Sequence, residues 1–326
     1  MITRRNLLIG LGAASLGAPL KSLAQSKTFR IGFLGPVSAS SYASRIAAFR
    51  QALRELGYVE GKNITIEERW ADGKYERLPG LAEELVKLKV DLIVTSTTPP
   101  SRAAQHSTRT IPIVMVSVSD PVGSGLVASL ARPGGYITGV ANLVGDTTEK
   151  QFDLLVATAP KLSRIAVLSN PDNQAMQGLI KKVQESAYKI GARVFLVQAR
   201  TPEEIDRAFS VMTQQGAKAL IVLAEPLFFQ QLTQVVNLAS KARLPAIYNA
   251  RQYVEAGGLM SYGSNNEEVH RYAARYVDRI LKGAKPSDMP VEQLSAMELT
   301  INKKTAKTLG ITFPREVLVL ADKVIE

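Results

Sequence analysis

The chain has 326 residues, of which 46% are apolar and 21% are charged, so two well-buried domains are expected and global disorder is excluded. It has no cysteine and only two histidines, His106 and His270, which excludes disulfide scaffolds, thiolate metal sites and cysteine nucleophiles and gives no basis for a multi-histidine metal site. The net charge of +11 is spread along the chain and aromatic residues are only 6%, so we interpret the basic excess as solvated surface and expect no nucleic-acid partner.

The N-terminal residues 1–24 have the features of an export signal. Arg4 and Arg5 precede an apolar stretch that is too short to cross a bilayer, and the small residues of Ser22-Leu23-Ala24 suit a signal peptidase. The paired arginines resemble a twin-arginine (Tat) signal, and a general secretory (Sec) signal is the alternative. We therefore expect cleavage after Ala24 and a soluble protein in the periplasm.

Short apolar runs then alternate with amphipathic stretches in two successive sets. In the first set, extended segments are predicted at 30–34, 63–70, 91–95, 112–118 and 137–141, and helices at 43–56 and 78–88. In the second set, extended segments are predicted at 164–168, 193–198, 219–223 and 245–248, and helices at 152–159, 175–190, 202–214 and 227–242. Continuous β-branched runs between helices are typical of parallel sheets that are covered on both faces.

The two sets resemble each other. Arg30–Leu34 followed by Gly35-Pro36 parallels Arg164–Leu168 followed by Ser169-Asn170-Pro171, and each leads through a helix to further strands. This weak internal repeat predicts an α/β fold with two Rossmann-like lobes. The rest of the chain adds a glycine-flanked extended segment, residues 257–263, a strongly amphipathic helix that ends at Gly283, and an extended piece near 297–302.

Ligands of parallel α/β sheets bind beyond the carboxyl ends of the strands, and polar residues stand at those positions here. In the first lobe they are Ser38, Ser40, Ser96, Thr97, Thr98 and Asp120. In the second lobe they are Asn170, Asn173, Glu225 and Asn249. Each of them taken singly is better explained as an ordinary helix N-cap, and only the set suggests a binding site.

The chemistry of these residues favours binding over catalysis. The Ser96-Thr97-Thr98 hydroxyls and the free N–H groups before a proline-containing helical turn favour an anion such as a carboxylate. Asp120 and Glu225 could hold an ammonium group from opposite lobes, although Asp120 before Pro121 is equally a turn residue. No Walker A, G-x-S-x-G, H-E-x-x-H or dinucleotide-binding motif is present, so we expect no catalytic residues, no metal and no cofactor.

Several segments, in this order and spacing, resemble the ABC-transporter substrate-binding proteins of the tryptophan/tyrosine-binding type. They are Gly57–Asn63, Asp91–Val94, Ile111–Val114, Ser119–Val122, Arg132–Gly135, Ile137–Val140, Gly257–Gly263, Ile280–Pro286 and Leu309–Ile311. The resemblance implies a type I periplasmic binding protein fold, with lobes joined by three crossings near Asn142, Gly257-Gly258 and 294–299. One lobe would comprise residues 29–142 and 258–293, and the other residues 143–257 and 294–326.

The resemblance also implies a function. The protein would capture a small organic solute between the lobes, without catalysis, and deliver it to an ABC permease in the inner membrane with its cytoplasmic ATPase; we expect a monomer. Asn142 stands where amino-acid-binding members often carry an acid, and its side chain has no charge to pair with an ammonium. This departure argues against an amino acid and for another organic acid or an aromatic compound, and the candidate ligands are organic acids, amino acids and aromatic compounds. Asn142 and Tyr262 complete the candidate site. The alternatives are a periplasmic sensor that feeds a membrane receptor and a secreted α/β enzyme.

Overall fold

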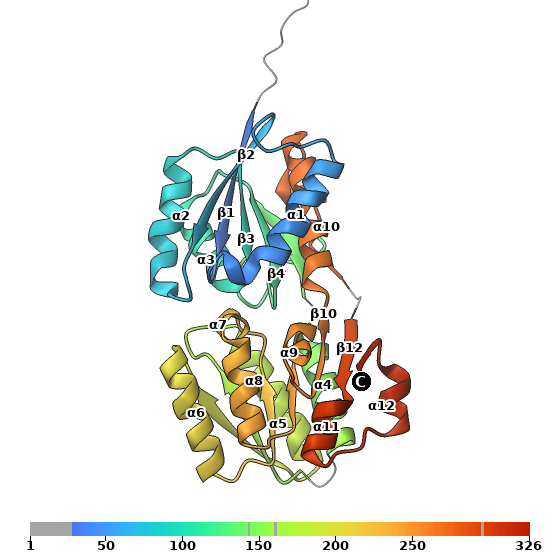
Figure 1. Cartoon of the computed structure of the whole chain (residues 1–326). Coiled ribbons are helices and arrows are strands. Elements are labelled where there is room, and N and C mark those ends of the chain that lie inside the picture. The colour runs from blue at the N-terminus through green and yellow to red at the C-terminus, as the bar shows by residue number, and fades with distance from the viewer. Residues whose placement is uncertain (1–27, 143, 160–161, 295–296) are drawn as a thin grey trace, which may run out of the picture.

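Buried strands and amphipathic helices alternate along the chain and form two lobes stacked end to end, each around its own sheet (Figure 1). The computed structural model describes residues 28–142, 144–159, 162–294 and 297–326. The expected signal peptide, residues 1–24, and its cleavage site lie outside this described part. Within the described part, no helix combines the length and the apolar character needed to cross a membrane.

The first lobe has a six-stranded parallel sheet in the order β11-β5-β4-β3-β1-β2. Its strands are β1 (Phe29–Gly35), β2 (Ile64–Trp70), β3 (Leu92–Ser96), β4 (Ile113–Val118), β5 (Ile137–Ala141) and β11 (Glu292–Gln293). One face is covered by α1 (Ala43–Glu55) and α10 (Asn266–Leu281), and the other by α2 (Leu78–Lys87) and α3 (Thr98–Ser107). Alternate residues of β1 reach both faces, because Ile31 and Phe33 pack on the side of α1 and Leu34 on the side of α2.

The second lobe has a seven-stranded sheet in the order β13-β12-β10-β9-β8-β6-β7, which is parallel except for the pair β10–β12. Its strands are β6 (Arg164–Ser169), β7 (Arg193–Gln198), β8 (Ala219–Val222), β9 (Ala246–Tyr248), β10 (Met260–Ser264), β12 (Met297–Asn302) and β13 (Lys323–Ile325). One face carries α4 (Val144–Thr158), α5 (Met176–Lys189), α11 (Lys303–Leu309) and α12 (Arg315–Leu320); the other carries α6 (Pro202–Gln214), α7 (Pro226–Gln230), α8 (Leu232–Lys241) and α9 (Arg251–Glu255). The prediction of two α/β lobes with parallel sheets is confirmed.

The second crossing between the lobes lies later in the chain than expected. Strand β10 pairs with β9 and β12, so residues 260–264 belong to the second sheet, whereas the expected division placed them in the first lobe. Gly257 and Gly258 form the turn between α9 and β10, and their N–H groups bond to the carbonyls of Val254 and Tyr253. The glycines therefore mark a turn inside the second lobe, and the chain returns to the first lobe at the start of α10.

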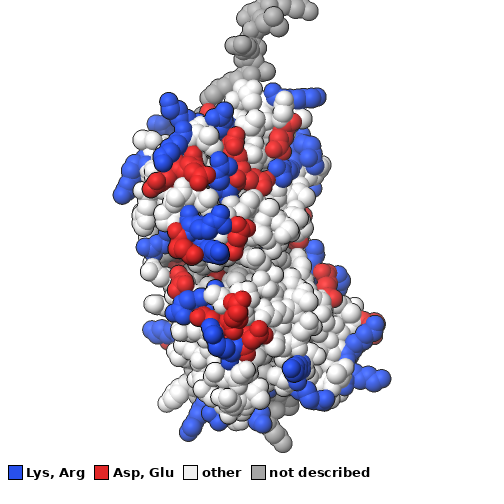
Figure 2. All heavy atoms as spheres, turned by 60° about the vertical axis from the view of Figure 1, so that its left-hand side comes forward, with Lys and Arg blue, Asp and Glu red and all other residues white. Residues whose placement is uncertain are grey.

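The charged side chains on the face shown in Figure 2 are intermixed. Lys and Arg side chains stand beside Asp and Glu side chains over both lobes, and no large basic patch is present on this face. Ion pairs in the first lobe follow the same pattern, with Arg69 Nε 2.6 Å from Glu84 Oε2 and Arg77 Nη1 2.6 Å from Asp72 Oδ2. Pairs this exposed contribute about 0–1 kcal/mol each, so they shape the surface more than they stabilise the fold.

Candidate functional site

A cavity lies between the two lobes, beyond the carboxyl ends of the strands of both sheets. It contains about 480 Å³ of empty space, part of which is open to solvent. Residues following β3, β4 and β5 line it from the first lobe, and residues following β6, β8 and β9 line it from the second. The two sheets therefore present their carboxyl edges to one shared space, where parallel α/β sheets place ligands.

Arg45, in the first turn of α1, brings a buried positive charge to this cavity. Its side chain is only 6% exposed, and its guanidinium carbon lies 4.4 Å from the ring centre of Tyr42 and 4.1 Å from that of Phe229. In the described part of the chain, Nε has no hydrogen-bond acceptor and no carboxylate pairs with the guanidinium. A buried charge without a counterion is costly, and a guanidinium edge matches the geometry of a carboxylate, so Arg45 is suited to an anionic ligand.

Two buried hydroxyls in the same wall also have no partner. Thr97 and Ser117 have φ angles of 73° and 56°, in a region that residues other than glycine rarely adopt. Ser117 lies at a bulge between Val116 and Val118, which turns it out of the ladder between β4 and β5. Thr97 Oγ1 and Ser117 Oγ are buried without a hydrogen-bond partner among the described residues. Strained residues with free hydroxyls facing a cavity are typical of ligand-binding positions.

Glu225, at the N-terminus of α7, is a buried acid whose oxygens are already occupied. Asn170 Nδ2 donates to Oε1 at 3.0 Å and Asn173 Nδ2 donates to Oε2 at 2.7 Å. Tyr75, from the 3₁₀ turn Tyr75–Arg77 of the first lobe, donates its hydroxyl hydrogen to Oε1 across the cleft. Burial raises the pKa of the Glu225 carboxyl against the opposing effect of these donors, and burial and the Glu225 charge raise the pKa of Tyr75.

A neutral histidine supports the wall behind Arg45. Burial, together with the charge of Arg45, lowers the pKa of His270 to about 3, so the imidazole is uncharged. Its Nδ1 lies 2.8 Å from the carbonyl oxygen of Asn266 and must donate there, which makes Nε2 an acceptor, 3.3 Å from Ser96 Oγ. Ser96 Oγ is also 3.3 Å from Tyr42 Oη, so α10, β3 and the start of α1 are joined beneath the cavity.

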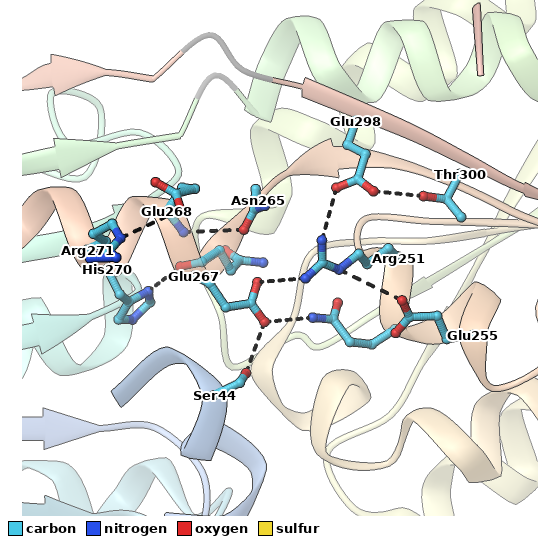
Figure 3. Close-up of polar contacts among 12 residues, drawn as sticks. Ser44, Arg251, Glu255, Asn265, Glu267, Glu268, His270, Arg271, Glu298 and Thr300 are labelled. Atoms are coloured by element: carbon cyan, nitrogen blue, oxygen red, sulfur yellow. Dashed lines mark hydrogen bonds and ion pairs between the residues drawn. The ribbon is translucent and has the colours of Figure 1, made fainter. Parts of the chain in front are cut away.

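A second polar cluster joins the lobes where β10 passes into α10 (Figure 3). Glu267 Oε1 accepts hydrogen bonds from Ser44 Oγ at 3.0 Å and from Gln252 Nε2 at 3.1 Å. Arg251 lies among three acids, with Nη2 3.7 Å from Glu267 Oε2, Nη1 3.6 Å from Glu298 Oε2 and Nε 3.9 Å from Glu255 Oε1. Because Ser44 belongs to the first lobe and Arg251 and Gln252 to the second, this cluster connects the lobes at a crossing.

The structure brings together part of the predicted site. Thr97, Thr98, Asn142, Asn173, Glu225 and Asn249 all line the cavity. Asn170 lies behind it on Glu225, and Ser96 is fully buried on Tyr42 and His270. These two residues therefore position others and do not face the cavity.

The remaining predicted residues lie outside the cavity. Asp120 Oδ1 accepts from the Gly123 N–H at 2.8 Å, which is the turn alternative, and it lines a neighbouring pocket. Ser38 and Ser40 bond to each other, with 3.1 Å between their oxygens. Tyr262 packs against the core of the second lobe and offers its carbonyl to Gln151. No cluster of three His, Cys, Asp or Glu side chains suited to a metal occurs among the residues that the structure describes.

The sequence did not single out the cavity residues Tyr42, Arg45, Ser117 and Phe229. For Arg45 a signal existed. It follows Tyr42 by three residues and precedes Phe49 by four, which places its side chain on the buried face of α1. For Ser117 there was none, because it lies inside an apolar run and only the bulge turns it toward the cavity.

Two of the relatives with similar sequence or structure are described as binding an aromatic amino acid or are solved with one bound. The chain is 29% identical over 291 residues to a tyrosine-binding protein of Clostridioides difficile (strain R20291), which covers 89% of this chain and 84% of the relative. An ABC domain from Streptococcus pneumoniae in complex with L-Trp matches with a TM-score of 0.85 at 29% identity, over 92% of this chain and 100% of that one.

A ligand-free, open structure of a substrate-binding protein with adhesive properties from Clostridium difficile matches with a TM-score of 0.66 at 28% identity, over 91% and 99% of the two chains. Both solved structures match nearly all of the described part of this chain. The two-lobed architecture that they share with it is that of type I periplasmic binding proteins. From residue 30 to residue 325 the sequence fits the family model of the ABC transporter substrate binding proteins, and the chain belongs to that family.

Proposed function

We propose that this protein is the solute-binding component of an ABC importer, that it is exported to the periplasm, and that it binds a small organic solute between its lobes without chemical change. The observation that carries the proposal is the buried, unpaired guanidinium of Arg45 in a cavity lined by both lobes. A protein that binds a solute without changing it needs a charged group that recognises the solute, such as this guanidinium. It does not need a set of catalytic residues.

Contacts across the cleft support a mechanism of lobe closure. Tyr75 of the first lobe bonds to Glu225 of the second, Arg102 Nη1 donates to Gln174 Oε1 at 3.0 Å, and Arg45 lies over the Phe229 ring. Opening the lobes would break all three contacts. A solute that touches both walls binds the closed form better than the open form and shifts the population toward closure.

The comparison with relatives favours a closed conformation. Two relatives of nearly equal identity match this chain unequally, with a TM-score of 0.85 for the L-Trp complex and 0.66 for the ligand-free, open structure. Since identity and coverage are similar, we attribute the difference to the relative position of the lobes. The closed form would present both lobes as one surface to the permease, and we expect the protein to act as a monomer.

A thermal-shift screen of the purified mature protein tests this function. The library should contain organic acids, amino acids, sugars and nucleosides. At least one compound should raise the melting temperature, because a ligand that binds only the native state at about 100 times its Kd stabilises it by about 2.7 kcal/mol. If no class of compound shifts the transition, or if a bound compound is converted to a product, the proposal fails.

A further inference from the structure

The cavity has one cation and one acid among the described residues that line it, and their states differ. Arg45 has no ionic partner, as described above. Glu225 receives hydrogen bonds from Tyr75, Asn170 and Asn173, and a backbone hydrogen bond from Leu227. An ionised carboxylate has about four lone-pair positions, so these donors fill Glu225 and leave no acceptor for a ligand ammonium.

The other polar groups of the cavity are neutral. Asn249 Oδ1 is buried and has no hydrogen-bond donor among the described residues. The Asn249 backbone is held closely by β10, because a Cβ on Gly263 would lie 2.0 Å from the Asn249 carbonyl oxygen. Asn142 lines the same space, and its side chain is also an uncharged amide. These amides suit a neutral donor on the ligand, whereas an ammonium would lose its hydration without finding a free carboxylate oxygen to bond to.

Building on the function proposed above, we propose that the cavity binds a small carboxylic acid that carries a hydroxyl group in place of an ammonium group. Its carboxylate pairs with Arg45 and with the hydroxyls of Thr97 and Ser117, and its hydroxyl donates to Asn249 Oδ1. In this arrangement, the buried polar atoms of the cavity wall that have no hydrogen-bond partner would each gain one from the ligand. It also separates the ligand class from the amino acids named for relatives of this chain.

Matched pairs of compounds test the ligand class directly. Titration calorimetry on the purified mature protein would compare lactate with alanine, 2-hydroxyisocaproate with leucine, 3-phenyllactate with phenylalanine, and indole-3-lactate with tryptophan. Within each pair only the hydroxyl and the ammonium differ. For at least one pair, the hydroxy acid should bind and the amino acid should bind at least tenfold more weakly.

Two arginine variants test the carboxylate contact. Arg45→Gln should lose binding of that hydroxy acid, and Arg54→Gln, an exposed position on the same helix, should keep it. Should Arg45→Gln fail to fold, Arg45→Lys retains the charge without the planar fork, and it should bind the hydroxy acid more weakly than the unaltered protein does. Unchanged affinity in the variant that folds would remove Arg45 from the site.

The outcomes separate this inference from the proposed function. Tighter binding of the amino acid within the pairs overturns the inference and leaves a solute-binding protein. Failure of every hydroxy acid, across alkyl, phenyl and indole side chains, also overturns it. The proposed function fails as well if the wider library of sugars, nucleosides and acids yields no ligand, or if a bound compound is converted to a product.

Discussion

Single residues set the charge of the inter-lobe cavity, and Arg45 is the clearest case. Its stem leaves a helix face that packs against the sheet, and its guanidinium lies over one ring from each lobe. Rings stabilise a cation through their negative faces by about 0.5–2 kcal/mol, which only partly offsets its lost hydration. On the proposed function, an anion that entered the cavity would recover the remaining cost, and we therefore expect Arg45 to couple ligand charge to closure.

Asn142 offers a gain-of-function prediction at this scale. Asn142→Asp would add a negative charge to the cavity wall, which repels a ligand carboxylate and attracts an ammonium. We expect the affinity for the best hydroxy acid to fall about tenfold, or 1.4 kcal/mol, and the affinity for the matching amino acid to rise. Calorimetry on both compounds measures the change. Asn237→Asp, exposed on α8, is the control, and an equal loss there would contradict a local effect.

The residues show what a sequence can and cannot reveal about a site. Thr97, Glu225 and Asn249 were predicted because they follow strands, and strand ends are readable from apolar runs. Arg45 was missed because a charge is ordinarily solvated and only its helical spacing reveals burial. Phe229 was predicted within a helix but not at the site, because its role depends on a contact with the opposite lobe.

At the scale of elements, most segments with a clear apolar period or run were predicted, including the short strands β8 and β9, whereas α3, α9 and β11 were not. The expected helix at 43–56 corresponds to α1, whereas the expected helix at 227–242 is divided at Gln231 into α7 and α8. Short pieces such as α9 and β11 are stabilised by contacts with other parts of the fold, which local periodicity does not record. The crossing expected at Gly257-Gly258 is a turn inside the second lobe, because β10 after it pairs within the second sheet.

The 3₁₀ turn that carries Tyr75 should control how firmly the lobes close. Tyr75→Phe removes the hydroxyl that bonds to Glu225, and hydrogen bonds to charged groups contribute about 1.5–3 kcal/mol. A loss of 1–2 kcal/mol from the closed form would weaken ligand binding roughly 5- to 30-fold. Small-angle scattering without ligand should also report a larger radius of gyration. Tyr188→Phe, at a side chain that is 86% exposed, should change neither quantity.

The packing of α10 on the sheet predicts a dependence of stability on pH. His270 titrates near pH 3 when folded and near 6.5 when unfolded, so the unfolded chain binds the extra proton between these values. Stability from the neutral imidazole is complete above pH 6.5 and is lost as the pH falls toward 3. The free energy of unfolding should decline by up to about 1.4 kcal/mol per pH unit from this group.

Comparison of two histidine variants isolates that contribution. Urea unfolding between pH 7 and 5 should show a steeper loss for the unaltered protein than for His270→Gln. His106 is exposed, so His106→Gln should follow the unaltered protein. Parallel pH curves for all three proteins would show that the buried imidazole does not contribute.

At the scale of the whole molecule, export is the property that the N-terminal sequence predicts. Mass spectrometry of the secreted protein should find a chain that begins at Gln25. Replacing Arg4 and Arg5 by lysine should trap the precursor in the cytoplasm if the Tat route is used, since that route reads the arginine pair. Continued export of the lysine variant would favour the Sec route, and an uncleaved cytoplasmic chain in the unaltered protein would contradict export.

The ring of Phe229 covers Arg45 from the opposite lobe, and this has a consequence for how cargo is sorted. Closure of the lobes without a ligand removes water from the guanidinium of Arg45 and gives it no anionic partner. A methyl ester or an amide of the ligand would fit the same space, but it carries no charge that could compensate the desolvation of Arg45. We therefore expect such neutral analogues to bind the open conformation. Only anionic ligands would then be presented to the permease in the closed form.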